Sequence, residues 1–117
     1  MIPGTWWPFG RVPEIDAEAL AQALCDDRIQ IVDVRTLVEF RRSRIEGARH
    51  LPITRLTPEG VRHLHLDPNR PVVAICLTAH RSIPAVRVLR KMGYDARQLR
   101  GGMRAWWRSS RPCVRGG

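Results

Sequence analysis

One cysteine in this chain is followed by a pattern that could activate its sulfur. Cys76 ends an apolar run over residues 71–76, and four residues separate it from Arg81. A loop this short, between a strand and a helix, can turn its backbone N–H groups toward an anionic sulfur, and a nearby guanidinium adds positive charge. Because the thiolate is the nucleophilic form of cysteine, the pattern predicts nucleophilic chemistry at Cys76.

The sequence on both sides of Cys76 predicts the elements that would hold this loop. Residues 71–76 have no polar interruption after Pro71, which is typical of a strand that is covered on both faces. Residues 82–92 place apolar side chains at helical spacing, and Gly93 follows as a helix-ending residue. We therefore expect the site at the carboxyl end of a central strand, where open α/β sheets bind their ligands.

The rest of the chain alternates between the same two patterns. A short apolar run predicts a strand at residues 30–34, and we expect brief strands at residues 49–51 and 96–99. Capped or amphipathic segments predict helices at residues 16–24, 36–42, 57–66 and 103–107. The alternation favours an α/β fold with an open, mostly parallel sheet and helices on both faces. We interpret residues 1–117 as a single domain, with residues 1–10 and 111–117 as loose ends.

Composition excludes several classes of function. The chain has 117 residues and no apolar run near the roughly 18 residues of a membrane span, so we expect no membrane partner. Residues 1–10 lack the pattern of a signal peptide, and a cytoplasmic location is the expectation. The three cysteines are widely spaced, which favours neither a disulfide framework nor a metal site, and no cofactor is expected. The net charge of +9 comes from scattered arginines rather than a basic run, so we expect no nucleic-acid partner.

The loop from Cys76 to Arg81 resembles the active-site loop of the rhodanese family, which has a cysteine, four residues and an arginine. Four other segments resemble family motifs and occur in the family's order. They are Glu14 to Leu20, Val32-Asp33-Val34-Arg35 with Glu39-Phe40, Ile45-Glu46-Gly47-Ala48 with Leu51-Pro52, and Leu99-Arg100-Gly101-Gly102-Met103-Arg104-Ala105-Trp106. The resemblance implies a five-stranded rhodanese-like fold and sulfurtransferase activity.

The resemblance also implies roles for individual residues. Cys76 would take a sulfane sulfur from thiosulfate or a low-molecular-weight persulfide and pass it, as a persulfide, to a thiol or a protein acceptor. Arg81 would be the second catalytic residue and would hold the anionic group of the donor. The other residues expected to bind substrate lie in the loop or at the end of a neighbouring strand: Leu77, Thr78, Ala79, His80, Ser82, Asp33 and Arg35.

Two loop residues depart from the family pattern. Ala79 stands where glycine is frequent, and alanine costs about 1 kcal/mol or more wherever φ must be positive. Leu77 stands where a basic or polar residue is frequent, which favours a persulfide over the thiosulfate dianion as donor. At the neighbouring strand, the alternatives to substrate contact are that Asp33 caps a turn and that Arg35 pairs with Glu39.

Other functions remain open at this point. A non-catalytic rhodanese-like binding module is one alternative, although the presence of both Cys76 and Arg81 favours an enzyme. A cysteine-dependent phosphatase or arsenate reductase is another. Phosphatase loops place five residues between the cysteine and the arginine, and this chain has four.

Overall fold

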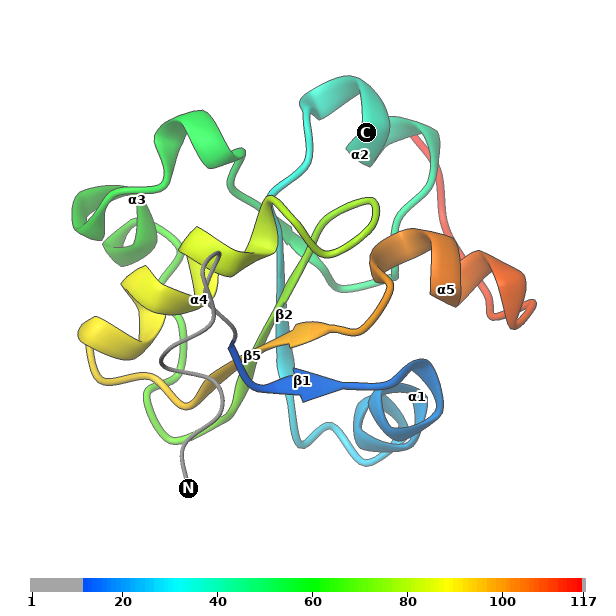
Figure 1. Ribbon diagram of the computed structural model, residues 1–117, viewed down its shortest axis with the longest axis horizontal. Helices are drawn as coiled ribbons and strands as arrows, with labels where there is room; N and C mark the ends of the chain where they lie inside the picture. Colours follow the sequence, from blue (N-terminus) through cyan, green and yellow to red (C-terminus); the bar gives the residue numbers. More distant parts are fainter. Residues whose placement is uncertain (1–11, 117) are drawn as a thin grey trace.

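The computed structural model describes residues 12–116, and these form a five-stranded sheet in which every pairing is parallel (Figure 1). The strands are β1 (Glu14–Ile15), β2 (Gln30–Asp33), β3 (Arg49–His50), β4 (Val72–Ile75) and β5 (Ala96–Leu99). Their order across the sheet is β1-β5-β4-β2-β3. The expected open α/β sheet is confirmed, with β4 in its centre.

Helices cover both faces of this sheet. They are α1 (Ala17–Cys25), α2 (Leu37–Arg42), α3 (Pro58–Arg62), α4 (Ser82–Lys91) and α5 (Gly102–Arg108), with a short 3-10 helix, η2 (Ile53–Arg55). Figure 1 shows α3 and α4 on one side of the sheet and α1 and α5 on the other. Within residues 12–116, no helix combines the length and the apolar character that crossing a membrane requires.

The central strand β4 explains why the run before Cys76 is apolar throughout. Every β4 side chain is fully buried, and alternate residues face opposite sides of the sheet. Val72 and Ala74 pack in the core that α3 and α4 cover, whereas Val73 and Ile75 pack in the core that α1 and α5 cover. Burial on both faces leaves no position in β4 where a polar side chain would meet water.

Side-chain caps begin α1, α2 and α3, and the cap at Asp16 is the one that the sequence predicted. Asp16 Oδ1 accepts a hydrogen bond from the Ala19 N–H at 2.8 Å at the start of α1. Thr36 and Glu39 form a reciprocal capping box at the start of α2. The helix expected at residues 57–66 is shorter than predicted and ends at Arg62. The chain then reaches His65, whose φ of 53° is incompatible with a continuing right-handed helix.

Two stretches near the ends of the described residues have structure that the sequence did not predict. Glu14 and Ile15 lead into α1 as expected, but they also form β1, which pairs with Gln98 and Leu99 at the edge of the sheet. The C-terminal residues, expected to be loose, are hydrogen-bonded to the body through residue 116, and the loose end expected at residues 1–10 lies outside the described residues.

The C-terminal segment, residues 112–116, forms hydrogen bonds through its backbone with two parts of the domain. Val114 exchanges backbone hydrogen bonds with Arg44, at 3.0 and 2.8 Å. The indole N–H of buried Trp106 donates to the Pro112 carbonyl at 3.0 Å. A buried indole N–H requires an acceptor, and this segment supplies it.

Deleting residues 112–117 is therefore expected to lower the free energy of unfolding by about 1–3 kcal/mol, because Trp106 loses its acceptor. Urea denaturation followed by fluorescence measures the change. The control is Pro112→Ala, which keeps the backbone carbonyl and should leave the midpoint nearly unchanged. An unchanged midpoint in the deletion variant would show that the segment contributes nothing to stability.

Candidate active site

Cys76 lies directly after the central strand, with its side chain 1% exposed. Its sulfur has two polar neighbours. The backbone N–H of Ala79 donates to Cys76 Sγ at 2.9 Å, and the Ser82 hydroxyl lies 3.4 Å from the sulfur. The chain thus turns back over the sulfur between β4 and α4, as expected for a loop that stabilises a sulfur anion.

Several N–H groups of this loop have no acceptor among the described residues. Within residues 12–116, the backbone N–H groups of Thr78, His80 and Arg81 donate no hydrogen bond. Such groups before and at the first turn of a helix favour anions, because nothing in the helix accepts their hydrogen bonds. An anionic group that enters the loop would therefore find donors already in place.

The carbonyl groups on the other side of the loop are bound by α5. The Met103 N–H donates to the Cys76 carbonyl at 2.8 Å, and the Arg104 N–H donates to the Leu77 carbonyl at 3.1 Å. In a trans peptide the C=O and the following N–H point in opposite directions. The N–H groups of Leu77 and Thr78 consequently point away from α5.

Gly102 makes this approach between α5 and the loop possible. A Cβ atom at Gly102 would lie 2.5 Å from the carbonyl oxygens of both Cys76 and Leu77, which is closer than any real contact. Sequence reasoning matched this glycine to a family motif without assigning it a role. The available signal was a pair of glycines at the start of a helix, and both adopt a positive φ, 74° at Gly101 and 59° at Gly102.

Ala79 has a positive φ, the conformation expected at a loop position where the family often has glycine. Its φ is 102°, a value that L-residues rarely adopt. This same residue donates the hydrogen bond to the cysteine sulfur. The strained residue is thus the one whose N–H contacts Cys76. The contacts of the surrounding loop must stabilise this conformation.

The Ser82 hydroxyl is part of a buried polar chain that sequence reasoning missed. It donates to Gln98 Oε1 at 2.6 Å, and Gln98 Nε2 donates to Glu14 Oε2 at 2.9 Å. Because the single hydroxyl proton of Ser82 is directed to Gln98, its oxygen can accept the proton of a Cys76 thiol. The available signal for Gln98 was a polar residue in a strand that is otherwise mostly buried.

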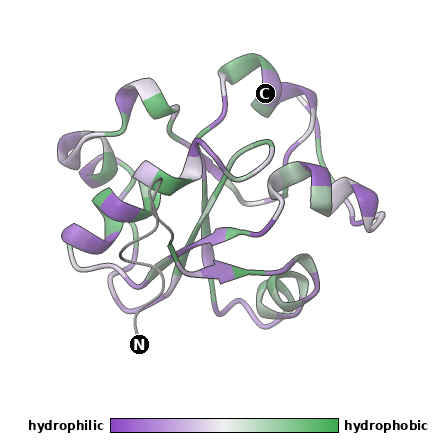
Figure 2. Ribbon diagram, in the orientation of Figure 1, coloured by the Kyte–Doolittle hydropathy of each residue, from purple (hydrophilic) through white to green (hydrophobic). Residues whose placement is uncertain are grey.

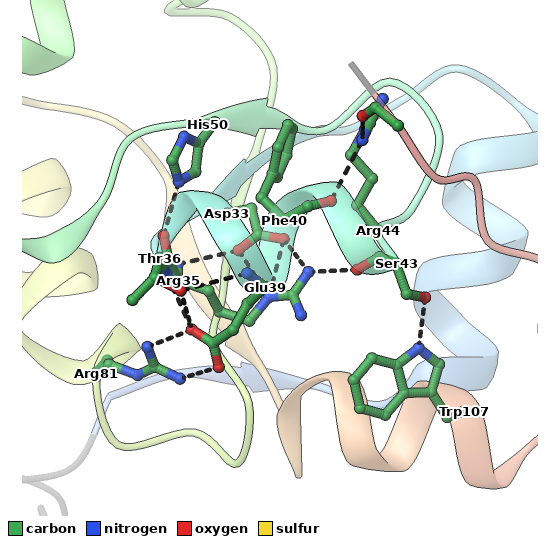
Figure 3. Close-up of polar contacts among 11 residues, drawn as sticks. Asp33, Arg35, Thr36, Glu39, Phe40, Ser43, Arg44, His50, Arg81 and Trp107 are labelled. Atoms are coloured by element: carbon green, nitrogen blue, oxygen red, sulfur yellow. Dashed lines mark hydrogen bonds and ion pairs between the residues drawn. The ribbon is translucent and has the colours of Figure 1, made fainter.

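Arg81 does not stand free at the mouth of the loop (Figure 3). Its NH1 and NH2 groups bind Glu39 Oε1 and Oε2 at 2.8 and 2.9 Å. Hydrogen bonds from Arg81 lower the pKa of Glu39 from 4.5 to about 2, and the pKa of Arg81 is raised chiefly by the same contact. Glu39 is therefore fully ionised at neutral pH and balances the charge of the guanidinium.

The sequence predicts that Asp33 and Arg35 bind substrate at the rim of the site. In the structure both side chains are buried and do not line that rim. Each side chain is only 1% exposed, and Arg35 NH2 binds Asp33 Oδ2 at 2.8 Å. Arg35 also donates to the Ser43 carbonyl at 2.6 Å, and Asp33 Oδ1 accepts from the Arg35 backbone N–H at 3.0 Å. Charges that are buried this deeply must be paired. The alternative that Asp33 caps a turn is confirmed, whereas Arg35 pairs with Asp33 and not with Glu39.

Three residues of the loop, Thr78, Ala79 and His80, line a small hollow. Thr78 Oγ1 and His80 Nδ1 lie 3.0 Å apart, and His80 is exposed. A cavity of about 220 Å³ next to the loop is lined by Thr78, Ala79, His80, Ile83 and Gln98, together with Val12 and Glu14. Leu77 is half-buried.

The other cysteines are not part of this arrangement. Cys25 is exposed at the end of α1, and Cys113 is partly buried in the C-terminal segment. All three cysteines are free thiols. Among residues 12–116, no three His, Cys, Asp or Glu side chains are grouped so that they could hold a metal ion.

Comparison with known proteins agrees with this geometry. The family model of the rhodanese-like domain matches residues 16–109. The chain belongs to this family. YrkF of Bacillus subtilis, which is named provisionally as a sulfur carrier protein, is 32% identical over 97 residues, 81% of this chain and 51% of YrkF.

Solved structures show the same fold. A thiosulfate sulfurtransferase from Pseudomonas aeruginosa superposes with a TM-score of 0.80 at 26% identity, over 91% of this chain and 21% of that chain. A rhodanese-like domain protein from Staphylococcus aureus superposes with a TM-score of 0.69 at 29% identity, over 80% of this chain and 90% of that chain. This rhodanese-like domain spans about half the length, 51% and 55%, of the first curated relatives that it matches.

The buried ion pair is expected to contribute far more to stability than a similar pair on the surface. Asp33→Asn leaves a buried guanidinium without its counter-charge and should cost about 3–5 kcal/mol. The matched control is Asp95→Asn, because Arg97 binds Asp95 at 2.9 Å across the same sequence separation but with both side chains one-third or more exposed. That change should cost about 1 kcal/mol or less. Equal losses in urea denaturation would contradict the assigned difference in burial.

The Glu39–Arg81 pair predicts a specific dependence of stability on pH. Because the pKa of Glu39 is lowered to about 2, the pair stabilises the fold above the ordinary pKa of 4.5, and this stabilisation is lost as pH falls toward 2. Glu39→Gln should therefore lower the free energy of unfolding by about 1–2 kcal/mol at pH 7, a value reduced for partial exposure. The difference from the wild type should shrink steadily below pH 5.

The control for this prediction is Glu59→Gln. Glu59 occupies the first turn of α3 and forms no ion pair within residues 12–116. A constant difference between Glu39→Gln and the wild type from pH 7 to pH 2 would mean that the carboxylate charge is not what stabilises the pair.

Proposed function

We propose that this domain is a sulfurtransferase in which Cys76 carries a sulfane sulfur as a persulfide. The observation that supports this most directly is the loop itself. The Ala79 N–H already binds Cys76 Sγ at 2.9 Å, and further N–H groups of the loop have no acceptor within residues 12–116. A persulfide adds one anionic sulfur beyond Sγ, and these donors are suited to bind it.

The reaction divides into two displacements. The Cys76 thiolate attacks the outer sulfur of the donor, a new S–S bond forms, and the electron pair of the broken bond leaves with sulfite or with a thiolate. The acceptor then attacks the outer sulfur of the persulfide, and the electron pair returns to Cys76. Two nucleophilic steps of this kind need a positioned sulfur and anion donors rather than a general base.

The charges within the loop itself favour a persulfide donor over thiosulfate. Arg81 is the arginine of the loop, and Glu39 binds both of its terminal nitrogens. Leu77, which is half-buried, adds no charge. A dianion would therefore meet a nearly neutral ion pair, whereas a low-molecular-weight persulfide brings less charge and more apolar surface. The acceptor in this scheme is a thiol, either small or part of a protein.

Cys76→Ser should abolish sulfur transfer without unfolding the domain, because serine is nearly isosteric and a hydroxyl cannot form a persulfide. We expect kcat/KM to fall by about 10³-fold or more. The measurement is thiocyanate formation from cyanide, with glutathione persulfide and with thiosulfate as donors. The matched controls are Cys25→Ser and Cys113→Ser, which should retain the wild-type rate.

Two results would overturn the proposal. Retention of turnover in Cys76→Ser, or its loss in Cys25→Ser, would move the site to another cysteine. Absence of turnover in the wild type with both donors would favour a binding module.

A further inference from the structure

The exposed apolar side chains of this domain lie on two helices. Within residues 12–116, the large hydrophobic side chains that are exposed are Leu37 at 46%, Val38 at 63% and Trp107 at 39%. Leu37 and Val38 form the first turn of α2, and Trp107 lies in α5. Exposed hydrophobic residues that are scattered singly are ordinary, but a group on neighbouring elements is typical of an interaction surface.

Both helices border the loop of Cys76. Helix α2 is bound to it through Glu39 and Arg81, and α5 is bound to it through the Met103 N–H and the Cys76 carbonyl. The two helices are also joined to each other, because the Trp107 indole donates to Ser43 Oγ at 3.0 Å (Figure 3). In Figure 1 the loop projects between α2 and α5. The two helices that carry the exposed apolar side chains therefore both contact the loop of Cys76.

The same helices have an excess of positive charge. Hydrophobic and hydrophilic segments alternate along α2 and α5 in Figure 2. Their exposed basic residues are Arg41, Arg42, Arg104 and Arg108. Glu39 is the one carboxylate in these two helices, and Arg81 binds both of its oxygens. We call these four arginines together with Leu37, Val38 and Trp107 the docking face.

Two carboxylates near the loop already have partners elsewhere. Asp33 is buried against Arg35, and Glu14 binds Arg100 and Gln98. The side chains of the four arginines form no ion pair within residues 12–116. A partner that covers this face must therefore bring both negative charge and apolar surface.

We propose that the docking face binds an acidic polypeptide segment that presents a cysteine thiol to Cys76 as the sulfur acceptor. The proposal rests on the sulfurtransferase function above and names its acceptor. A small thiol cannot cover apolar side chains on two helices at once, and the backbone of a nucleic acid offers them no apolar surface. A polypeptide with carboxylates around a hydrophobic residue satisfies both requirements.

The transfer step is balanced without another reactant. The acceptor thiolate attacks the outer sulfur of the Cys76 persulfide, and a new S–S bond forms between the acceptor and that sulfur. The bond between the two sulfurs on Cys76 breaks, and its electron pair stays on Cys76 as the thiolate. The proton of the outer sulfur, where present, leaves with the acceptor persulfide.

The test compares two peptide acceptors and cyanide on the full chain. The probes are Ac-EELCEE-amide and Ac-KKLCKK-amide, with glutathione persulfide as donor. We expect kcat/KM for the acidic peptide to exceed that for the basic peptide by about tenfold or more at low salt. This ratio should shrink as salt is added, because exposed charges are screened, while cyanide turnover changes little.

Variants locate the effect on the docking face. Arg41→Glu with Arg108→Glu should reduce or reverse the preference for the acidic peptide, and Val38→Ser should lower kcat/KM for that peptide. Neither change should alter cyanide turnover. The matched control is Arg62→Glu with Lys91→Glu, an equal charge reversal at exposed positions of α3 and α4. The control should keep the wild-type preference.

The outcomes separate this inference from the function on which it rests. Equal kcat/KM for both peptides with normal cyanide turnover would overturn the docking face and leave the sulfurtransferase intact. The same loss of preference in the control variant would assign the effect to net charge and would also overturn it. Absence of cyanide turnover in the wild type would overturn the sulfurtransferase proposal, and the acceptor proposal with it.

Discussion

Two hydrogen bonds from the start of α5 determine the conformation on which the candidate site depends. They bind the carbonyl groups of Cys76 and Leu77, so the loop directs its carbonyl dipoles toward α5 and the following N–H groups away from it. Gly102 allows this approach, because any Cβ atom there would collide with both oxygens. The positive φ of Ala79 follows from the same constraint, since the chain must turn back over the sulfur before α4 begins.

Two ion pairs link this loop to the rest of the sheet. The buried pair of Asp33 and Arg35 fixes the end of β2 and, through the Ser43 carbonyl, the end of α2. Helix α2 in turn places Glu39 where it binds Arg81. The pair of Asp33 and Arg35 is buried away from water and fixes the backbone around it. The pair of Glu39 and Arg81 determines how much net positive charge the loop presents to a substrate. Arginine is thus used for structure at one position and for charge balance at the other.

The sequence predicted those features that depend on local pattern. The apolar run of β4, the cap at Asp16 and the spacing from Cys76 to Arg81 each lie within a few residues, so their physical basis is visible in the chain itself. Strand β1 was missed because it has two residues, which is too short for a period to appear, and it exists only through its pairing with β5. The choice of Arg81 over Arg35 as partner of Glu39 was missed for the same reason. The partner of Glu39 depends on how distant segments pack against each other, and the local sequence is compatible with either arginine.

The central claim is that Cys76 carries the transferred sulfur, and mass spectrometry of the intact protein tests it most directly. After incubation with glutathione persulfide and removal of the excess donor, we expect a mass increase of one sulfur atom, located on the peptide that contains Cys76. Cyanide should remove the added mass and yield an equal amount of thiocyanate. An unchanged mass, or an added sulfur located at Cys25 or Cys113, would show that Cys76 is not the residue that carries the sulfur.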